Sequence, residues 1–195
     1  MDKTMSKIVA VVASPMIDGN SDTIVSAVTD GAMGLSTNII ELFRLDKFRT
    51  LRGCSACNDC KKTGRCIHND EIQEILDSIR DADVVIMSTP VYFNEVASQY
   101  KALEDRMYSF YNKDASHNIT EGKKAVIVVT CSYPVEVAEG VADRMSLTLE
   151  GLGFEVTDKL LFSNEGQTKH AKDDKDLMAR AKAAGKKFRN TPISA

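Results

Sequence analysis

Tryptophan is absent from this 195-residue chain, and so is any long apolar run. A helix that spans a bilayer needs about 20 consecutive apolar residues, and no segment approaches that length. The first residues, MDKTMSK, lack the apolar core of a secretory signal. With 25 basic and 28 acidic residues, the net charge of −3 gives no support for nucleic-acid binding. We therefore expect a cytoplasmic protein with neither a membrane nor a nucleic-acid partner.

Hydrolytic and disulfide motifs are missing as well. The three histidines, at positions 68, 117 and 170, are scattered, and no Ser/His/Asp set or pair of carboxylates stands out. No catalytic acid or base is therefore expected. Five cysteines in a reducing compartment do not form a disulfide framework, and four of them fall within 13 residues. The chain's chemistry is expected in those cysteines and in its loops.

Five apolar segments alternate with five amphipathic helical patterns. Strands are expected over residues 7–12, 37–43, 84–88, 125–130 and 154–162, the third ending at Thr89-Pro90 and the more polar fifth lying near a sheet edge. This alternation predicts an α/β fold, a flavodoxin-like doubly wound five-stranded parallel sheet of order 2-1-3-4-5 with helices on both faces. We expect one domain over residues 1–195, with a cysteine-rich loop at 53–67.

The loop after the first strand is small and polar and leads into a helix. In a sheet of this order, ligands bind at the carboxyl ends of the strands where the order reverses. Free N–H groups and the helix dipole would bind an anion there, although an ordinary turn with Ser and Asn caps has a similar sequence. The loop has neither a Walker A lysine nor a G-x-G-x-x-G pattern, so no NTP or Rossmann dinucleotide is indicated. Its hydroxyls and amide suit a terminal phosphate monoester.

The loops after the third and fourth strands add backbone amides and aromatic rings, and this combination fits FMN better than a bare nucleotide. Tyr92 and Phe93 are adjacent, so at least one should face a ligand or a partner and not the core. The predicted FMN-binding residues are Ser14, Met16, Asp18, Gly19, Asn20 and Ser21 in the first loop, Pro90, Val91, Tyr92, Phe93 and Asn94 in the second, and Thr130, Cys131 and Ser132 in the third.

The clustered cysteines, Cys54, Cys57, Cys60 and Cys66, have the spacing C-x2-C-x2-C-x5-C. Two-residue gaps let three thiolates curl around one face of an iron–sulfur cluster, and a fourth completes the ligation. The spacing predicts one [4Fe–4S] cluster. A loop with no cluster is the main alternative, whereas structural zinc usually draws two C-x-x-C pairs from separate segments. The fifth cysteine, Cys131, is expected to be a packing residue.

With these motifs in this order, the chain resembles the flavodoxin-like NADPH-dependent FMN reductase family, and more closely its iron–sulfur flavoprotein branch. The resemblance covers nearly the whole chain and rests on Ser14-Pro15 with Gly19-Asn20-Ser21, Thr89-Pro90-Val91-Tyr92, Lys101-Ala102-Leu103 with Asp105-Arg106, and the four cysteines with Asn69-Asp70. It implies a phosphate loop, a second flavin loop and a compact cluster motif. Met16 stands where many members carry an arginine, which removes a positive charge near the phosphate, so weaker FMN binding is expected.

The residues and the resemblance together predict an FMN-dependent oxidoreductase. It would pass electrons from NAD(P)H or a ferredoxin through the flavin and the cluster to an acceptor. A cluster-free NAD(P)H-dependent FMN or quinone reductase, and a pure electron carrier with no nicotinamide site, are the alternatives. The aromatics Tyr92, Phe93, Tyr108, Phe110 and Tyr111, with the resemblance, predict a homodimer or homotetramer. A cluster on the flavin side of the sheet would face the flavin of the same subunit or of a neighbour.

Overall fold

The structure is a computed structural model that describes residues 6–33 and 37–189. Its strands are β1 (Lys7–Val12), β2 (Ile39–Arg44), β3 (Val84–Tyr92), β4 (Glu95–Val96), β5 (Lys124–Cys131) and β6 (Glu155–Ser163). Its α-helices are α1 (Asn20–Met33), α2 (Cys60–Thr63), α3 (Glu71–Asp81), α4 (Ser98–Arg106), α5 (Val135–Gly151) and α6 (Lys175–Lys186). Short 3₁₀ turns are η1 (Leu45–Lys47), η2 (Met107–Phe110), η3 (Glu165–Gln167) and η4 (Ala171–Asp173).

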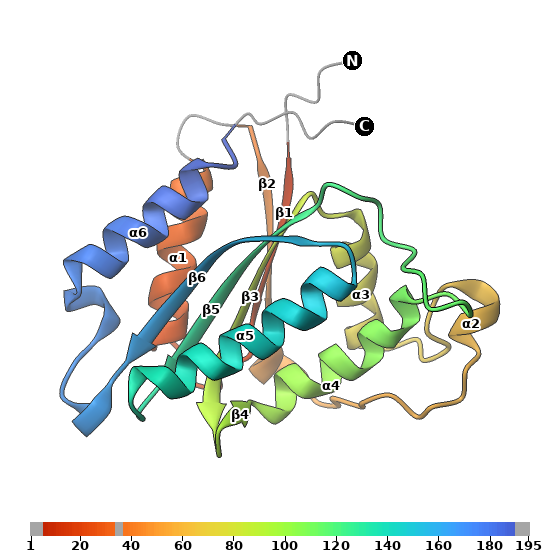
Figure 1. The fold of residues 1–195 in the computed structure, drawn as a ribbon, viewed down its shortest axis with the longest axis horizontal. Coiled ribbons are helices and arrows are strands. Elements are labelled where there is room, and N and C mark those ends of the chain that lie inside the picture. The colour runs from red at the N-terminus through yellow and green to blue at the C-terminus, as the bar shows by residue number, and fades with distance from the viewer. Residues whose placement is uncertain (1–5, 34–36, 190–195) are drawn as a thin grey trace.

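The main sheet is parallel, with strands in the order β2-β1-β3-β5-β6 (Figure 1). The two-residue strand β4 pairs antiparallel with β3 and lies off this path. Once β4 is set aside, this is the predicted order 2-1-3-4-5, which is therefore confirmed. The last strand, β6, lies at an edge, as its polar sequence predicted.

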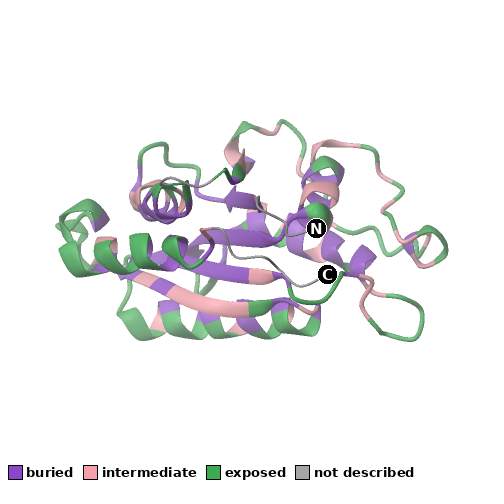
Figure 2. Cartoon of the chain, turned by 90° about the horizontal axis from the view of Figure 1, so that it is seen from above, coloured by how far each residue is buried: buried purple, intermediate pink, exposed green. Residues whose placement is uncertain are grey.

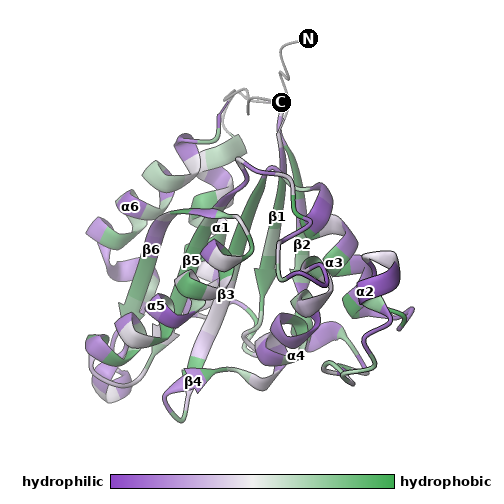
Figure 3. Ribbon diagram, turned by 45° about the vertical axis from the view of Figure 1, so that its right-hand side comes forward, coloured by the Kyte–Doolittle hydropathy of each residue, from purple (hydrophilic) through white to green (hydrophobic). Residues whose placement is uncertain are grey.

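Helices cover both faces of the sheet, because alternate residues of each strand point to opposite sides. In β1, Ile8, Ala10 and Val12 join the core under α1 and α6, whereas Val9 and Val11 join the core under α3, α4 and α5. The middle strands are buried along most of their length, and the helices expose their outer faces (Figure 2). The same strands are the most hydrophobic part of the fold (Figure 3).

Helices α1 and α6 cross with their backbones in close approach at two glycines. A Cβ atom on Gly31 would come within 2.3 Å of the Lys182 carbonyl oxygen, and one on Gly185 within 1.9 Å of the Val28 carbonyl oxygen. No larger residue fits at either position without moving a helix. This contact fixes α1, whose N-terminus follows the first polar loop.

The third strand is longer than predicted, because β3 continues through Thr89 and Pro90 to Tyr92. The prediction that it ends at Thr89-Pro90 is wrong. Strand β1 pairs with β3 only as far as Ser88, so Pro90 lies beyond the last β1 pair. A residue with no N–H is tolerated at such an edge position. No helix in the described residues 6–33 and 37–189 is long and apolar enough to cross a membrane.

Candidate functional site

Three loops meet in one pocket at the carboxyl edge of the sheet. They follow β1, β3 and β5, as the strand order predicts. Of the predicted residues, Ser14, Met16, Asp18, Gly19, Asn20, Ser21, Pro90, Val91, Tyr92, Thr130, Cys131 and Ser132 line this pocket, which we call the edge pocket. Phe93 and Asn94 do not line it. Predicted residues up to 118 positions apart in the sequence are thus brought together by the fold.

The first loop ends where α1 begins, and hydroxyl groups line its inner side. Ser14 Oγ accepts a hydrogen bond from the backbone N–H of Met16 at 3.2 Å, which leaves the hydroxyl proton free to donate. The hydroxyls of Ser21 and Thr130 lie 2.9 Å apart and share one hydrogen bond, so one of their two protons remains available. The first backbone N–H groups of α1, from Asn20 onward, have no acceptor within the helix. This end of the pocket is therefore rich in donors.

A fourth segment, which the sequence reasoning missed, closes the edge pocket on its far side. Asn164, Gln167, His170 and Lys172 all line the pocket. The segment follows β6, whose carboxyl end lies at the same edge of the sheet. Its place directly after a parallel strand was the feature of the sequence that could have predicted its position in the pocket. Asn20 holds it in place, because its Oδ1 atom accepts a hydrogen bond from the backbone N–H of Ala171 at 2.9 Å.

The residues after Tyr92 form a tight β-hairpin. Val91 pairs with Val96 and Tyr92 with Glu95, which leaves Phe93 and Asn94 as a two-residue turn. Both turn residues have positive φ, 50° and 63°, as a type I′ turn requires. Phe93 is 93% exposed, so the ring is presented to solvent at the tip of the hairpin. One of the paired aromatics therefore faces away from the core, as expected, whereas its contact with a ligand or a partner stays a prediction.

The four clustered cysteines line one narrow hollow, which we call the cysteine hollow. Cys54 and Cys57 are exposed, Cys66 is half-buried, and Cys60 is buried in the first turn of the short helix α2. Burial raises the pKa of the Cys60 thiol, the charge of Lys61 opposes this, and the other three cysteines add to the rise. Within the described residues, no three His, Cys, Asp or Glu side chains are close enough to hold a single metal ion.

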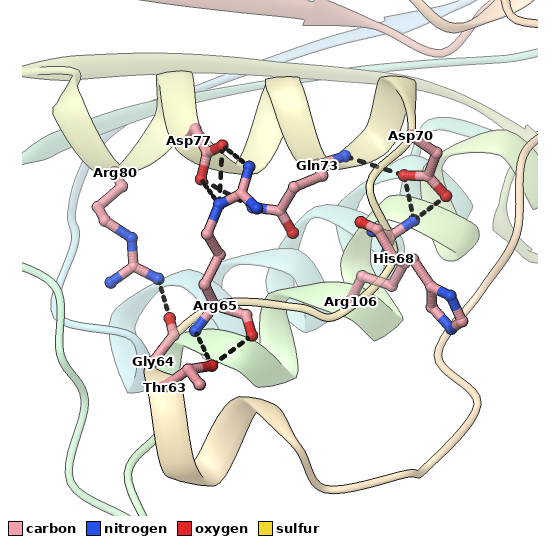
Figure 4. A network of polar contacts seen from close by, with 9 residues as sticks. All are labelled: Thr63, Gly64, Arg65, His68, Asp70, Gln73, Asp77, Arg80 and Arg106. Atoms are coloured by element: carbon pink, nitrogen blue, oxygen red, sulfur yellow. Dashed lines mark hydrogen bonds and ion pairs between the residues drawn. The ribbon is translucent and has the colours of Figure 1, made fainter.

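A polar network ties the cysteine segment to α3 and to the end of α4 (Figure 4). Arg65 forms an ion pair with Asp77 on α3, with an N···O distance of 2.6 Å. The fully buried Arg106 donates to both carboxylate oxygens of Asp70, at 2.6 and 2.7 Å, and to the carbonyl oxygen of His68 at 3.1 Å. The exposed Arg65 pair contributes little, about 0–1 kcal/mol, so the Arg106 contacts are the stronger anchor.

Lys61 anchors α2 to η2. Its ammonium group donates to the carbonyl oxygens of Tyr108 and Tyr111, at 2.6 and 2.7 Å, and lies 3.4 Å from the centre of the Tyr108 ring. Phe110, one of the aromatics expected at an interface, is instead fully buried in the core. The aromatic cluster is thus partly core packing, and Tyr92, Phe93 and Tyr108 remain exposed.

A profile of the family described as NADPH-dependent FMN reductase matches residues 6–169. The chain belongs to this family. It is 36% identical to an iron–sulfur flavoprotein of Methanocaldococcus jannaschii over 102 residues, 51% of each chain. It is 27% identical to an iron–sulfur flavoprotein of Archaeoglobus fulgidus over 136 residues, 68% of this chain and 59% of that one. The chain spans about half the length of the curated relatives it matches.

Solved structures of the same fold include an FMN-dependent NADH-azoreductase from Bacillus anthracis. The two structures superpose with a TM-score of 0.73 over 94% of this chain and 100% of that one, at 13% sequence identity. At this identity the similarity shows the fold alone. The resemblance to the iron–sulfur flavoprotein branch of the FMN reductase family is confirmed by the curated relatives.

The edge pocket has a donor set that fits the FMN of this family. Serine hydroxyls and the first amides of α1 lie at one end, where a phosphate accepts hydrogen bonds. Pro90, Val91 and the 47% exposed Tyr92 also line the pocket, and they would hold the planar ring system. Cys131 is buried at 7% exposure, and its thiol donates to the carbonyl oxygen of Tyr133 at 3.2 Å, which agrees with a packing role.

The cysteine hollow contains two buried donors without acceptors. Arg106 Nε and Ser109 Oγ are buried and have no hydrogen-bond partner within the described part of the chain, and both residues line the hollow. Unpaired buried donors are costly, and sulfur atoms of a bound cluster are suitable acceptors.

A third hollow separates these two sites. It is lined by residues from the hairpin, α4 and α5, and it touches the edge pocket at Tyr92 and the start of the cysteine segment at Gly53. Arg144 lines it and donates to both carboxylate oxygens of Glu104, at 3.0 and 3.1 Å. The cysteine hollow lies at the far end of α4 from this hairpin.

Proposed function

We propose that the protein is an FMN-dependent oxidoreductase that passes electrons from NAD(P)H or a ferredoxin to an acceptor. The observation that carries this proposal is the edge pocket, where three loops and the N-terminus of α1 present the donors that FMN needs. FMN, when bound, supplies the hydride and electron chemistry. The chain's own residues bind its phosphate at Ser14, Asn20 and Ser21 and position the ring system at Pro90–Tyr92 and Thr130–Ser132.

We further propose that Cys54, Cys57, Cys60 and Cys66 hold one [4Fe–4S] cluster. Their convergence on one hollow supports this, as do the two unpaired donors there and the names of the curated relatives. Such a site would let a flavin protein exchange electrons with a one-electron partner such as a ferredoxin or another small redox protein. We expect the reaction to take place in the cytoplasm.

The proposed enzyme acts as a homodimer or homotetramer. Helix α4 has nine residues, so at 1.5 Å per residue it is about 13 Å long. The cysteine hollow and the hairpin lie at opposite ends of this helix, so a cluster would face the flavin of the same subunit or that of a neighbouring subunit. The exposed Phe93 at the hairpin tip supports an interface near the edge pocket.

The test is anaerobic reduction of the purified protein, followed by its absorption spectrum. NADH, NADPH and a reduced ferredoxin are each mixed with the protein, and bleaching of the flavin bands is timed. Rapid bleaching by NADH or NADPH supports a reductase, whereas bleaching by the ferredoxin alone would identify an electron carrier with no nicotinamide site. Protein that cannot be loaded with FMN would refute the proposal.

The cluster has its own variant test in the same preparation. Cys60→Ala should abolish bound iron and leave FMN in place, since the edge pocket contains no part of residues 53–66. Ser55→Ala is the matched control, because Ser55 lines the same hollow but supplies no thiolate. Iron that survives in Cys60→Ala would contradict the assignment of Cys60 as a ligand. Wild-type protein with FMN and no iron would leave a cluster-free FMN or quinone reductase as the function.

A further inference from the structure

The first loop, at the phosphate end of the edge pocket, supplies no cation. Residues 14–21 contain no lysine, arginine or histidine, and they contribute the carboxylate of Asp18. Asp22 adds a second carboxylate on α1, but Arg44 forms an ion pair with it. Arg44 does not line the pocket, and Met16 is a neutral side chain with 68% exposure. A phosphate bound here would meet hydrogen-bond donors without a counter-charge from this loop.

Lys172, on η4, is the lysine that lines the edge pocket. Within the part of the chain that the structure describes, its ammonium group has no hydrogen-bond or ion-pair partner. The backbone on either side is fixed. Ala171, fully buried, donates its N–H to Asn20 Oδ1 at 2.9 Å, and Asp174 caps α6 by accepting from the N–H of Leu177 at 2.9 Å. Lys172 is thus held close to the first turn of α1.

The attachment through Asn20 is informative, because Asn20 is also the first residue of α1. The same residue that begins the anion-binding helix therefore fixes the position of the segment that carries the lysine. An exposed lysine on an unattached loop would have lost more conformational entropy on binding an anion. In this protein the backbone around Lys172 is already ordered before an anion binds, so binding loses less backbone entropy.

We propose that Lys172 supplies the positive charge that faces the FMN phosphate in this chain. It takes the place of the arginine that many family members carry at the position of Met16. The inference rests on the proposed FMN site and assigns to it a ligand from a segment outside the three flavin loops. A charge-assisted hydrogen bond contributes about ten- to a hundredfold in affinity. For an exposed lysine we take the lower end, about a tenfold contribution.

The experiment titrates protein stripped of flavin with FMN and, separately, with riboflavin, and follows quenching of the flavin fluorescence. In Lys172→Met, the dissociation constant for FMN should rise about tenfold and lose part of its dependence on salt. Riboflavin has no phosphate, so its affinity should not change. Lys169→Met is the matched control, since Lys169 lies in the same segment and does not line the edge pocket. It should bind both ligands as the wild type does.

A rescue variant completes the test. Met16 lines the same pocket. Adding Met16→Arg to Lys172→Met should therefore restore the affinity for FMN and leave the affinity for riboflavin unchanged. Equal losses in the two lysine variants, an equal loss for FMN and riboflavin, or unchanged FMN affinity in Lys172→Met would each overturn the assignment of Lys172. Wild-type protein that binds neither ligand would instead refute the proposed function. Circular dichroism of each variant confirms that it is folded.

Discussion

Asn20 and Ser21 each join two segments of the flavin site. The sequence predicted both as phosphate ligands, and the structure adds contacts that no local pattern reveals. Asn20 Oδ1 is bonded to Ala171, so its side-chain amide N–H groups are what remains for a ligand. Ser21 shares a hydrogen bond with Thr130, 109 positions away. Residue types could be predicted from the sequence, but their partners depend on which strand ends meet.

Replacing Ser21 with alanine should weaken FMN binding by about tenfold. The change removes the Ser21 hydroxyl from the pocket and leaves Thr130 without its hydrogen-bond partner, so the phosphate loses one donor that this pair holds in place. Ser26→Ala is the control, because Ser26 is an exposed residue on the same helix that does not line the edge pocket. Fluorescence titration measures both. Equal affinity in Ser21→Ala and Ser26→Ala would show that the hydroxyl takes no part in binding.

A single substitution at Ser109 tests whether the cysteine hollow holds a cluster. If its unpaired hydroxyl donates to a cluster sulfur, Ser109→Ala should bind iron as the wild type does but show a more negative cluster reduction potential, because hydrogen bonds to sulfur stabilise the reduced form. Ser88→Ala removes another unpaired buried hydroxyl, on β3 and outside the hollow. Spectroelectrochemistry should report no shift for this control. Identical potentials in all three proteins would contradict the contact.

At the scale of elements, long periodic segments were predictable and short ones were not. The five main strands and their order follow from apolar runs that alternate with helical patterns. Strand β4 was missed because it has two residues, and its turn, Phe93-Asn94, lacks the glycine that usually marks a type I′ turn. The segment that carries Lys172 was missed as well. Its role depends on the position of β6 beside β5, which only the assembled sheet shows.

The crossing of α1 and α6 gives a stability prediction at this scale. Gly185→Ala places a Cβ atom within 1.9 Å of the Val28 carbonyl oxygen, so the helices must separate, at a cost of about 1–3 kcal/mol in the free energy of unfolding. Gly140→Ala, on α5, meets no atom within 4 Å and should stabilise the protein by about 0.5–1 kcal/mol through helix propensity. Urea unfolding compares them. Equal stability in the two variants would mean that the close approach is not real.

On the scale of the whole molecule, the exposed hairpin tip is the feature least explained by an isolated chain. Phe93 holds a left-handed backbone conformation that is uncommon for a bulky residue and exposes nearly its whole side chain. The type I′ turn accounts for the backbone, whereas the exposure of the ring is expected if it packs against a second copy. The aromatics and the family resemblance predicted self-association. Among those aromatics, the structure leaves Tyr92, Phe93 and Tyr108 exposed and so able to contact a second copy.

Phe93→Asp should therefore shift the protein from a dimer or tetramer toward the monomer at micromolar concentration. Light scattering coupled to size-exclusion chromatography measures the mass directly. Leu147→Asp is the control, since Leu147 is also a highly exposed apolar residue, at 72%, and lies on α5 and not in the hairpin. The control should keep the wild-type mass. A monomeric wild type, or an unchanged mass in Phe93→Asp, would remove the hairpin as an interface.

The cofactor content of the whole molecule tests the central claim most directly. Protein purified without oxygen is analysed for FMN, iron and acid-labile sulfide per chain. The account predicts one FMN with about four irons and four sulfides, because the edge pocket and the cysteine hollow are separate sites built from different segments. FMN with no iron would make the protein a plain FMN reductase whose cysteines only form a loop. Iron without FMN after flavin loading would contradict the assignment of the edge pocket.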